Sequence, residues 1–232
     1  MAKTSEKPRS GARGKGVAKQ RTALTRERIA TAALEIIEGE GLAALSTRRL
    51  GDALGCEAMS IYHYFPSKQH IVDACVDHVV GTFELPPAGT DPLDRLRRTC
   101  AAYRALARKH PRFFPYIAVY RHNTPTGVRF IEGILGAVEA VVRDRERAAR
   151  YFRVLGYYLV GAALDETSGY AAGPSAAELV TDAYVAEHCP RLAAAAPYFK
   201  QAHWNATFDL GLDALLARMA NEPRLLRHRR SA

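Results

Sequence analysis

Apolar residues recur at helical spacing along most of the chain after residue 25. The first such segment follows Thr25, whose hydroxyl suits a helix N-cap. Its apolar positions are Ile29, Ala32, Ala33, Ile36 and Ile37. Gly39 and Gly41 predict where this helix ends, because glycine is favoured just past a helix C-terminus.

Two short helices separated by a glycine turn are predicted next. Ser46 caps the first and Gly55 ends it, while the second covers roughly 57–65 and is closed by Pro66. Ser67 opens a fourth helix. The apolar residues of that helix are Ile71, Val72, Cys75, Val76, Val79 and Val80.

A proline-rich interruption, Leu85-Pro86-Pro87 with Gly89, predicts a domain boundary after residue 84. Every convincing segment beyond it is helical. These segments cover about 91–109, a short stretch framed by Pro111 and Pro115, and the regions near 125–143, 145–170, 175–188 and 199–220. No alternating run between glycine or asparagine turns indicates a strand. The predicted fold is all-α, with one domain over 23–84 and a second helical domain over 85–220.

The positive charge of the chain is concentrated at its two ends. Of the formal net charge of +9, residues 1–28 carry +7 and residues 221–232 carry +3, so the body between them is at −1. Residues 1–22 show no apolar periodicity and are expected to form a disordered basic arm, and 221–232 a basic tail. Such an arm suits contact with nucleic-acid phosphates, although a solvated tail without a specific role explains it equally well.

The remaining composition excludes several classes of protein. Charges interrupt every long apolar stretch, and no apolar segment follows the basic N-terminus, so we expect no membrane span, no secretory signal and a cytoplasmic location. No Gly-x-Ser-x-Gly, phosphate loop or dinucleotide fingerprint indicates an enzyme. Four cysteines lie far apart and lack zinc-ligand spacing, which predicts reduced thiols, no metal and no cofactor. They are Cys56, Cys75, Cys100 and Cys189.

The two short helices form a candidate helix-turn-helix. Leu50, Leu54 and Ile61 are spaced to pack between them, and Phe65 is assigned to the core. In such a unit the second helix enters the major groove of DNA while the first braces it. The expected exposed residues of the second helix are small or carry polar rings, which suits contact with base edges and phosphates. They are Ala58, Met59, Ser60, Tyr62, His63 and Tyr64.

Further phosphate contacts are predicted at two helix N-termini. Thr47, Arg48 and Arg49 begin the first helix of the pair, where a hydroxyl, two cations and the helix dipole all favour an anion. Lys68 begins the fourth helix and offers the same kind of contact.

Residues 25–80 resemble the N-terminal domain of the TetR/AcrR family of transcription regulators. The resemblance is carried by Ser46-Thr47-Arg48-Arg49-Leu50, by Leu54-Gly55 and by Ile61-Tyr62-His63-Tyr64-Phe65-Pro66-Ser67-Lys68. It implies phosphate contacts by Thr47, Arg48, Tyr62, Tyr64 and Lys68, and a groove-facing part at Ala58, Met59, Ser60 and His63. Glu57 departs from the family, in which Ser or Thr often caps this helix. Repulsion of a phosphate by Glu57 and a contact to a cytosine amino group both remain open.

The resemblance also implies that the second domain binds an effector and dimerises. Candidates for a largely apolar pocket are aromatic and polar residues at helical sites, each of which on its own is more often a core residue. They are Tyr103, Phe114, Tyr120, His122, Phe130, Tyr158, Asp165 and Glu166. Small residues and one apolar helix face are the candidates for packing against a second copy. They are Gly156, Gly161, Trp204, Phe208, Leu212 and Leu215.

Together these patterns favour a homodimeric, ligand-responsive repressor that binds a palindromic operator in double-stranded DNA. Two recognition helices held roughly 34 Å apart would read both halves of a palindrome. An activator of the same architecture is one alternative. The other is a non-specific DNA-binding protein that uses its basic arm, which predicts equal affinity for any duplex and a steep salt dependence.

Overall fold

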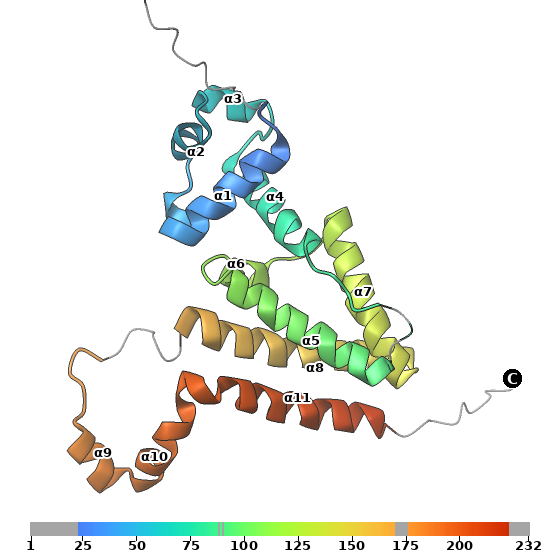
Figure 1. Ribbon diagram of the computed structural model, residues 1–232, viewed down its shortest axis with the longest axis vertical. Helices are drawn as coiled ribbons and strands as arrows, with labels where there is room; N and C mark the ends of the chain where they lie inside the picture. Colours follow the sequence, from blue (N-terminus) through green and yellow to red (C-terminus); the bar gives the residue numbers. More distant parts are fainter. Residues whose placement is uncertain (1–22, 88, 90, 170–175, 223–232) are drawn as a thin grey trace, which may run out of the picture.

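The chain is helical throughout the part that the structure, a computed structural model, describes: residues 23–87, 89, 91–169 and 176–222 (Figure 1). The expected all-α fold is confirmed within these ranges. The main helices are α1 (Arg26–Glu40), α2 (Thr47–Leu54), α3 (Ala58–Tyr62), α4 (Lys68–Gly81), α5 (Pro92–Lys109), α6 (Phe114–Val119), α7 (Pro125–Val142), α8 (Arg145–Leu164), α9 (Asp182–His188), α10 (Pro190–Ala195) and α11 (Trp204–Ala220). The predicted basic arm, 1–22, and nearly all of the predicted tail, 221–232, lie outside the described residues.

The ends of α1 and α2 follow from side-chain and glycine chemistry. Thr25 caps α1 by accepting a hydrogen bond from the Arg28 N–H at 3.2 Å, and Ser46 caps α2 in the same way from the Arg49 N–H at 3.1 Å. Gly41, at φ 91°, ends α1 in a backbone conformation that favours glycine. Gly39, by contrast, is part of α1 itself.

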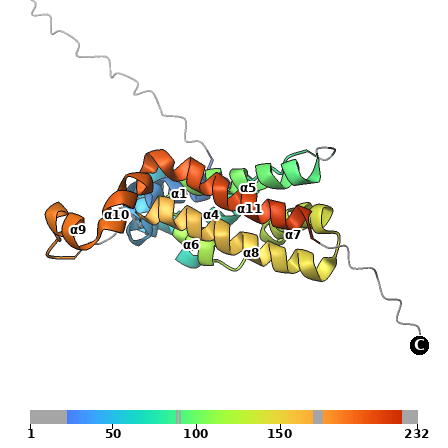
Figure 2. The same ribbon diagram turned by 90° about the horizontal axis from the view of Figure 1, so that it is seen from below.

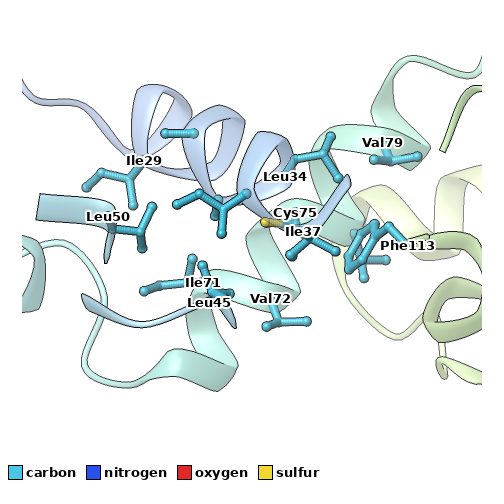
Figure 3. Close-up of a cluster of buried hydrophobic side chains, with 14 of the residues drawn as sticks. Ile29, Leu34, Ile37, Leu45, Leu50, Ile71, Val72, Cys75, Val79 and Phe113 are labelled. Atoms are coloured by element: carbon cyan, nitrogen blue, oxygen red, sulfur yellow. The ribbon is translucent and has the colours of Figure 1, made fainter. Parts of the chain in front are cut away.

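One hydrophobic core holds α1 to α4 together. Ile29, Ala33 and Ile37 of α1 are fully buried, as are Leu50 of α2 and Ile61 of α3. Figure 3 shows the side chains of Ile29, Ile37 and Leu50 together with those of α4 residues such as Ile71 and Cys75, with Phe113 of the following domain at one edge. Burial of each of these isoleucine and leucine side chains contributes about 1.5–3 kcal/mol to the free energy of folding.

The second domain is a bundle of longer helices. Helices α5, α7, α8 and α11 surround a core that includes Leu96, Val138, Leu155 and Leu212. Figures 1 and 2 show α8 and α11 lying side by side at the end of the molecule opposite α1–α4. Among the described helices, none is long and apolar enough to cross a membrane.

The two domains share part of one core. Leu106 of α5, Phe113 and Ile117 of α6 belong to the same buried cluster as α1 and α4. A polar contact reinforces this junction, because the Glu38 carboxylate at the end of α1 accepts the backbone N–H groups of Arg112 and Phe113 at 3.1 and 3.2 Å. Helix α6 is therefore held directly against the first domain.

The region after α8 differs most from the sequence expectation. The predicted helix 145–170 is α-helical only to Leu164 and continues as a π-helical turn over Asp165–Gly169. The predicted helix 175–188 begins only at Asp182, and α10 was not expected at all. In Figure 1, α9 and α10 form an excursion away from the bundle, which we call the excursion (residues 182–199). It begins and ends among turns and prolines, where apolar periodicity gives no reliable boundary.

Candidate DNA-binding surface and effector cavity

A single glycine allows α3 to lie close against α2. A Cβ atom at Gly51 would lie 2.7 Å from the Cys56 carbonyl oxygen, closer than real Cβ atoms come, and a tight 3.3 Å from the Ala58 nitrogen. Gly55 then turns the chain in the left-handed conformation, at φ 67°. The sequence expectation identified Gly55 but missed Gly51. The sequence feature that could have indicated Gly51 is its position inside a helix of only eight residues, where glycine is otherwise unfavourable.

Helix α3 presents its predicted groove-facing residues to solvent on one side. Met59 is 68% exposed, and Tyr62 and His63 are also exposed, whereas Ala58 and Ser60 are half-buried. Ile61 and Phe65 are fully buried on the opposite side and fix the helix to the core. Glu57 stands at the N-cap position but makes no capping hydrogen bond with its side chain.

The predicted phosphate-contacting residues surround α3 but are not equally free. Arg48 is exposed and Thr47 half-buried at the start of α2. Arg49 pairs with Glu40 at 2.6 Å, and this guanidinium holds the pKa of the Glu40 carboxyl below its usual range. Lys68 donates to the Leu42 carbonyl at 3.2 Å, and the Tyr64 hydroxyl donates to the Leu24 carbonyl at 2.8 Å.

These contacts separate two roles among the predicted residues. Tyr64 and Arg49 already have partners that tie α3 to the segment before α1 and α2 to the end of α1. Arg48, Tyr62 and His63 are exposed in or near the two helices of the helix-turn-helix. Cations and hydroxyls at helix N-termini are suited to phosphate, and small or exposed groups on α3 to base edges.

The second domain contains a cavity of about 720 Å³ between α5, α6, α7 and α8. This volume is within the range of small-molecule sites. Of the predicted pocket residues, Tyr103, Tyr120, His122 and Phe130 line it. The Tyr103 and Phe130 rings are stacked with centroids 6.4 Å apart, and the His122 ring meets the Phe130 edge at 5.6 Å. Burial raises the pKa of Tyr103 to about 12 and lowers the pKa of His122 below its usual value.

The other four predicted pocket residues do not line this cavity. Phe114 is fully buried with its ring against Tyr103, and the Tyr158 hydroxyl donates to the Phe208 carbonyl at 2.5 Å. Asp165 is exposed. The Glu166 side chain is 5% exposed and accepts from Arg104 at 2.5 Å and Arg108 at 2.8 Å. The two arginines supply the partners that this buried carboxylate needs, within the helix bundle.

Several cavity residues were missed from the sequence. They include Thr99 of α5, Arg121 beside α6, and Arg153 and Tyr157 of α8. Exposed arginines carry no sequence signal of a pocket, since a charged helix position is usually solvated. Only the folding of α6 and α8 onto the same cavity brings them together.

A second and wider hollow, of about 1120 Å³, lies between the starts of α5 and α8 and the ends of α7 and α11. Its lining includes many charged groups of both signs, among them Glu139, Arg145 and Glu146. Mixed surface charges do not suit an apolar effector, so the cavity beside α6 is the better candidate. No group of three His, Cys, Asp or Glu side chains is placed for a metal within the described part of the chain.

The predicted dimerisation residues are divided between the core and the surface. Phe208 and Leu212 are buried within this chain's own bundle, and Leu215 and Trp204 are half-buried. The sequence expectation placed this apolar face of α11 against a second copy, but it packs on α5, α7 and α8 instead. Gly156 and Gly161 both line the cavity, and Gly161 is also exposed. An amphipathic pattern identifies the apolar face of a helix without saying which neighbour covers it.

Comparison with known proteins gives two family matches that together span most of the described chain. Residues 29–75 match the family of bacterial regulatory proteins described as the tetR family. Residues 85–222 match the tetracyclin repressor-like C-terminal domain.

Two relatives are similar over nearly their whole length. The chain is 27% identical to an HTH-type transcriptional regulator of Saccharopolyspora erythraea over 205 residues, 85% of each protein. It is also 27% identical to the tetracycline repressor protein class A from transposon 1721 of Escherichia coli, over 89% of this chain and 95% of that protein.

Solved structures agree with these matches. A possible TetR family transcriptional regulator from Streptomyces coelicolor superposes with a TM-score of 0.68 at 27% identity, over 83% of this chain and 97% of that one. The Streptomyces coelicolor TetR family protein ActR, solved in complex with actinorhodin, gives the same TM-score and identity over 84% and 95%. The helix-turn-helix and the C-terminal helical domain are therefore those of a DNA-binding transcription regulator rather than an enzyme, and the chain belongs to the tetR family of bacterial regulatory proteins.

Proposed function

We propose that this regulator is a homodimeric repressor that binds a palindromic DNA operator and is released by a small-molecule effector. The observation that carries the proposal is the position of α6. Its residue Ile117 lines the cavity and also belongs to the core shared with α1 and α4. A compound that displaces α6 therefore acts on the domain that carries the helix-turn-helix.

For DNA contact, we assign sequence reading to Ala58, Met59, Ser60 and His63 and phosphate contact to Thr47, Arg48, Tyr62 and Lys68. The exposure of Met59, Tyr62 and His63 supports this division. Arg49 and Tyr64 act mainly by holding the helices in place, since both are bonded within the chain. The Lys68 ammonium also donates to the Leu42 carbonyl, but it has further donors for a phosphate. A DNA-binding regulator works where the chromosome is, so we expect it in the cytoplasm.

For the homodimer, two exposed stripes on adjacent helices supply a contact surface. On α11, Leu210 is 74% exposed and lies in line with the exposed small residues Ala206, Ala214 and Ala217. On α8, Val154 and Gly161 are exposed seven residues apart, on one face of the helix. Small residues let helices approach closely, and two copies of this pair form a four-helix interface.

The excursion gives independent support for a second copy. Figure 1 shows its helices apart from the bundle, and it carries large apolar side chains that are exposed. They are Tyr184, Leu192, Tyr198 and Phe199. A monomer seldom leaves so much apolar surface in water, so a partner is expected to cover it.

Transmission from the cavity to the DNA-binding domain uses Glu38. Its carboxylate accepts two backbone N–H groups at the start of α6, and Arg112 donates in return to the Gly39 carbonyl. Displacement of α6 either breaks these hydrogen bonds or pulls the end of α1 along with α6, so that α1 tilts. The effector then favours a dimer whose two recognition helices are wrongly spaced for the operator.

The effector is expected to be largely apolar, because aromatic and aliphatic side chains form most of the cavity wall. The names of two similar proteins are consistent with an effector that contains rings. One is a tetracycline repressor, and the other was solved in complex with actinorhodin. Which compound this chain binds depends on the residues that line its own cavity.

The proposal is tested by mobility shift with duplexes from the DNA flanking the gene. A specific dimeric repressor protects a palindrome, releases it when the effector is added, and prefers it at least about a thousandfold over a scrambled duplex. Deleting residues 1–22 should weaken binding to all duplexes by a similar modest factor. Equal affinity for both duplexes, lost entirely with the arm, would instead establish a non-specific DNA-binding protein.

A further inference from the structure

We propose that the cavity beside α6 selects compounds that combine an aromatic ring system with a single negative charge. The proposal rests on the effector-binding function proposed above and adds the chemical class of the effector. The charges of the cavity wall and its aromatic geometry each support it.

The charged residues of the cavity wall are all positive. Arg121 and Arg153 line it, and among the described residues that line it there is no aspartate or glutamate. Both arginines are exposed, so they stay hydrated and charged at the rim while the interior is apolar. A guanidinium binds carboxylate, sulfonate or phenolate oxygens with paired hydrogen bonds and repels a cation.

Arg153 is held in position at this rim. Its Nη2 donates to the Tyr157 hydroxyl at 3.2 Å, and its guanidinium lies 4.9 Å from the centre of the Tyr157 ring. Both residues line the cavity. An arginine that is already oriented loses less conformational freedom when an anion binds.

Two acidic residues of α4 lie close to the cavity wall without lining it. Asp73 interacts with Tyr120, and Asp77 with His122. Both carboxylates have partners in the chain, because Asp77 accepts a hydrogen bond from the Thr124 hydroxyl at 2.5 Å and Asp73 accepts one from Gln69 at 2.8 Å. The charged groups that the described wall itself offers to a bound compound are therefore Arg121 and Arg153.

Aromatic side chains line the interior of the cavity and suit a ligand with aromatic rings. Tyr103, Phe130 and His122 form a connected set of stacked and edge-to-face rings, and Phe152 lines the same cavity. Aromatic rings prefer such offset and edge-on neighbours. Burial raises the pKa of Tyr103 to about 12 and lowers the pKa of His122, so both stay neutral hydrogen-bonding groups at neutral pH.

The test uses two fluorescent probes of nearly the same shape and different charge. 8-Anilinonaphthalene-1-sulfonate carries one negative charge, and N-phenyl-1-naphthylamine is its neutral counterpart. We expect the full-length protein to bind the sulfonate more tightly, with an affinity that falls as salt is added, while binding of the neutral probe hardly changes with salt. Arg121→Gln and Arg153→Gln should each weaken the sulfonate about tenfold and leave the neutral probe within about twofold.

Two further variants identify where the probes bind. Ile134→Trp places a bulky ring in the cavity wall and should abolish the specific binding of both probes. Arg145→Gln removes the same charge from α8 outside this cavity and should change neither. Retained binding of the neutral probe verifies that the arginine variants are folded.

The outcomes separate this proposal from the function on which it rests. Equal affinity for the two probes, or an Arg145→Gln effect as large as that of Arg153→Gln, would overturn the anionic class and leave the cavity standing. If Ile134→Trp alters neither probe, the cavity is not a binding site, and the effector-responsive function fails with it.

Discussion

Gly51 has a hydrogen atom where any other residue would place a Cβ atom, and the turn before α3 occupies that space. A methyl group there would lie 2.7 Å from the Cys56 carbonyl, which belongs to the backbone and cannot rotate away. The geometry of the DNA-binding unit thus depends on a residue that touches no DNA.

Gly51→Ala is therefore expected to push α3 away from α2. We expect a loss of roughly 1–3 kcal/mol in the free energy of unfolding and a loss of operator affinity larger than that of non-specific DNA affinity. Thermal unfolding and mobility shift measure the two effects. The matched control is Gly39→Ala, also inside a helix, where a Cβ atom meets nothing within 4 Å; it should stabilise the protein by about 0.4–1 kcal/mol. Equal behaviour of the two variants would contradict the role of Gly51.

One buried and one half-buried histidine, His110 and His122, predict a loss of stability in acid. Burial lowers the pKa values of His110 and His122 below 6.5, so the unfolded chain binds more protons than the folded one below that pH. Their contribution is fully present above pH 6.5 and is lost as the pH falls through the lower folded-state pKa values. The raised pKa of Glu38, caused by its burial, acts with the opposite sign above pH 4.5.

The double variant His110→Gln/His122→Gln isolates this contribution. Between pH 7.5 and 5.5, we expect its melting temperature to fall less than that of the unmodified protein. His70→Gln on the exposed start of α4 is the control and should follow the unmodified protein. Parallel pH profiles for the double variant and the unmodified protein would refute the prediction.

Individual residues of the DNA-binding surface were predictable from the sequence because they occur in a fixed local order. The caps Thr25 and Ser46 and the burial of Phe65 are confirmed, and each depends on neighbours within a few positions. The pairing of Arg49 with Glu40 and the contact of Tyr64 with Leu24 join residues that the sequence does not place together. Those contacts follow only from the packing of α1 on α2 and α3.

Helix α8 is joined to α5 through a buried ionic contact. Glu166, in the π-helical turn after α8, accepts from Arg104 and Arg108, and the Arg104 guanidinium also lies 4.2 Å from the centre of the Phe208 ring of α11. Three helices thus meet at one carboxylate. The sequence suggested Glu166 as an effector contact because a charge on an apolar helix needs a partner, and the structure supplies that partner within the chain.

Glu166→Gln should leave the Arg104 guanidinium buried without its countercharge. Because the amide keeps one acceptor oxygen and Arg108 is exposed, we expect a loss of about 2–3 kcal/mol rather than the full cost of an uncompensated buried charge. Urea unfolding measures this change. Glu146→Gln is the control: Glu146 is 74% exposed and pairs with Arg150 on the surface, so its loss should be below about 1 kcal/mol. Equal losses would show that burial does not strengthen the Glu166 contact.

At the level of elements, the N-terminal helices were predicted closely and the region after α8 was not. Caps, glycines and Pro66 mark the boundaries of α1 to α4, so local rules suffice there. The excursion lacks a periodic apolar face against the bundle, and its helices are short. Its position depends on surfaces outside this chain's own core, which sequence periodicity does not describe.

At the scale of the whole molecule, α8 and α11 lie side by side in Figure 2 and carry exposed apolar residues that no described part of the chain covers. On α11, Leu210 is 74% exposed. The sequence predicted an interface on these two helices, and the proposed interface uses the side of α11 that the core leaves uncovered.

Leu210→Arg should separate the dimer, because each interface would then bury two unpaired like charges. We expect dimer dissociation to be at least about tenfold easier, with a parallel loss of operator affinity, since a monomer reads only one half-site. Analytical ultracentrifugation and mobility shift follow the two quantities. Val128→Arg, an equally conspicuous change at an exposed position of α7, should alter neither. A variant that remains dimeric would place the interface elsewhere.

The shared core of the two domains limits how this regulator can be recombined. A hybrid protein that joins residues 23–84 to a foreign sensor would leave behind Leu106, Phe113 and Ile117, which complete the core of α1 and α4. The apolar surfaces of α1 and α4 would then face a partner of the wrong shape. A designer who wants to transplant its DNA specificity should therefore carry α6 and its turn along with the helix-turn-helix, or move only the exposed side chains of α3.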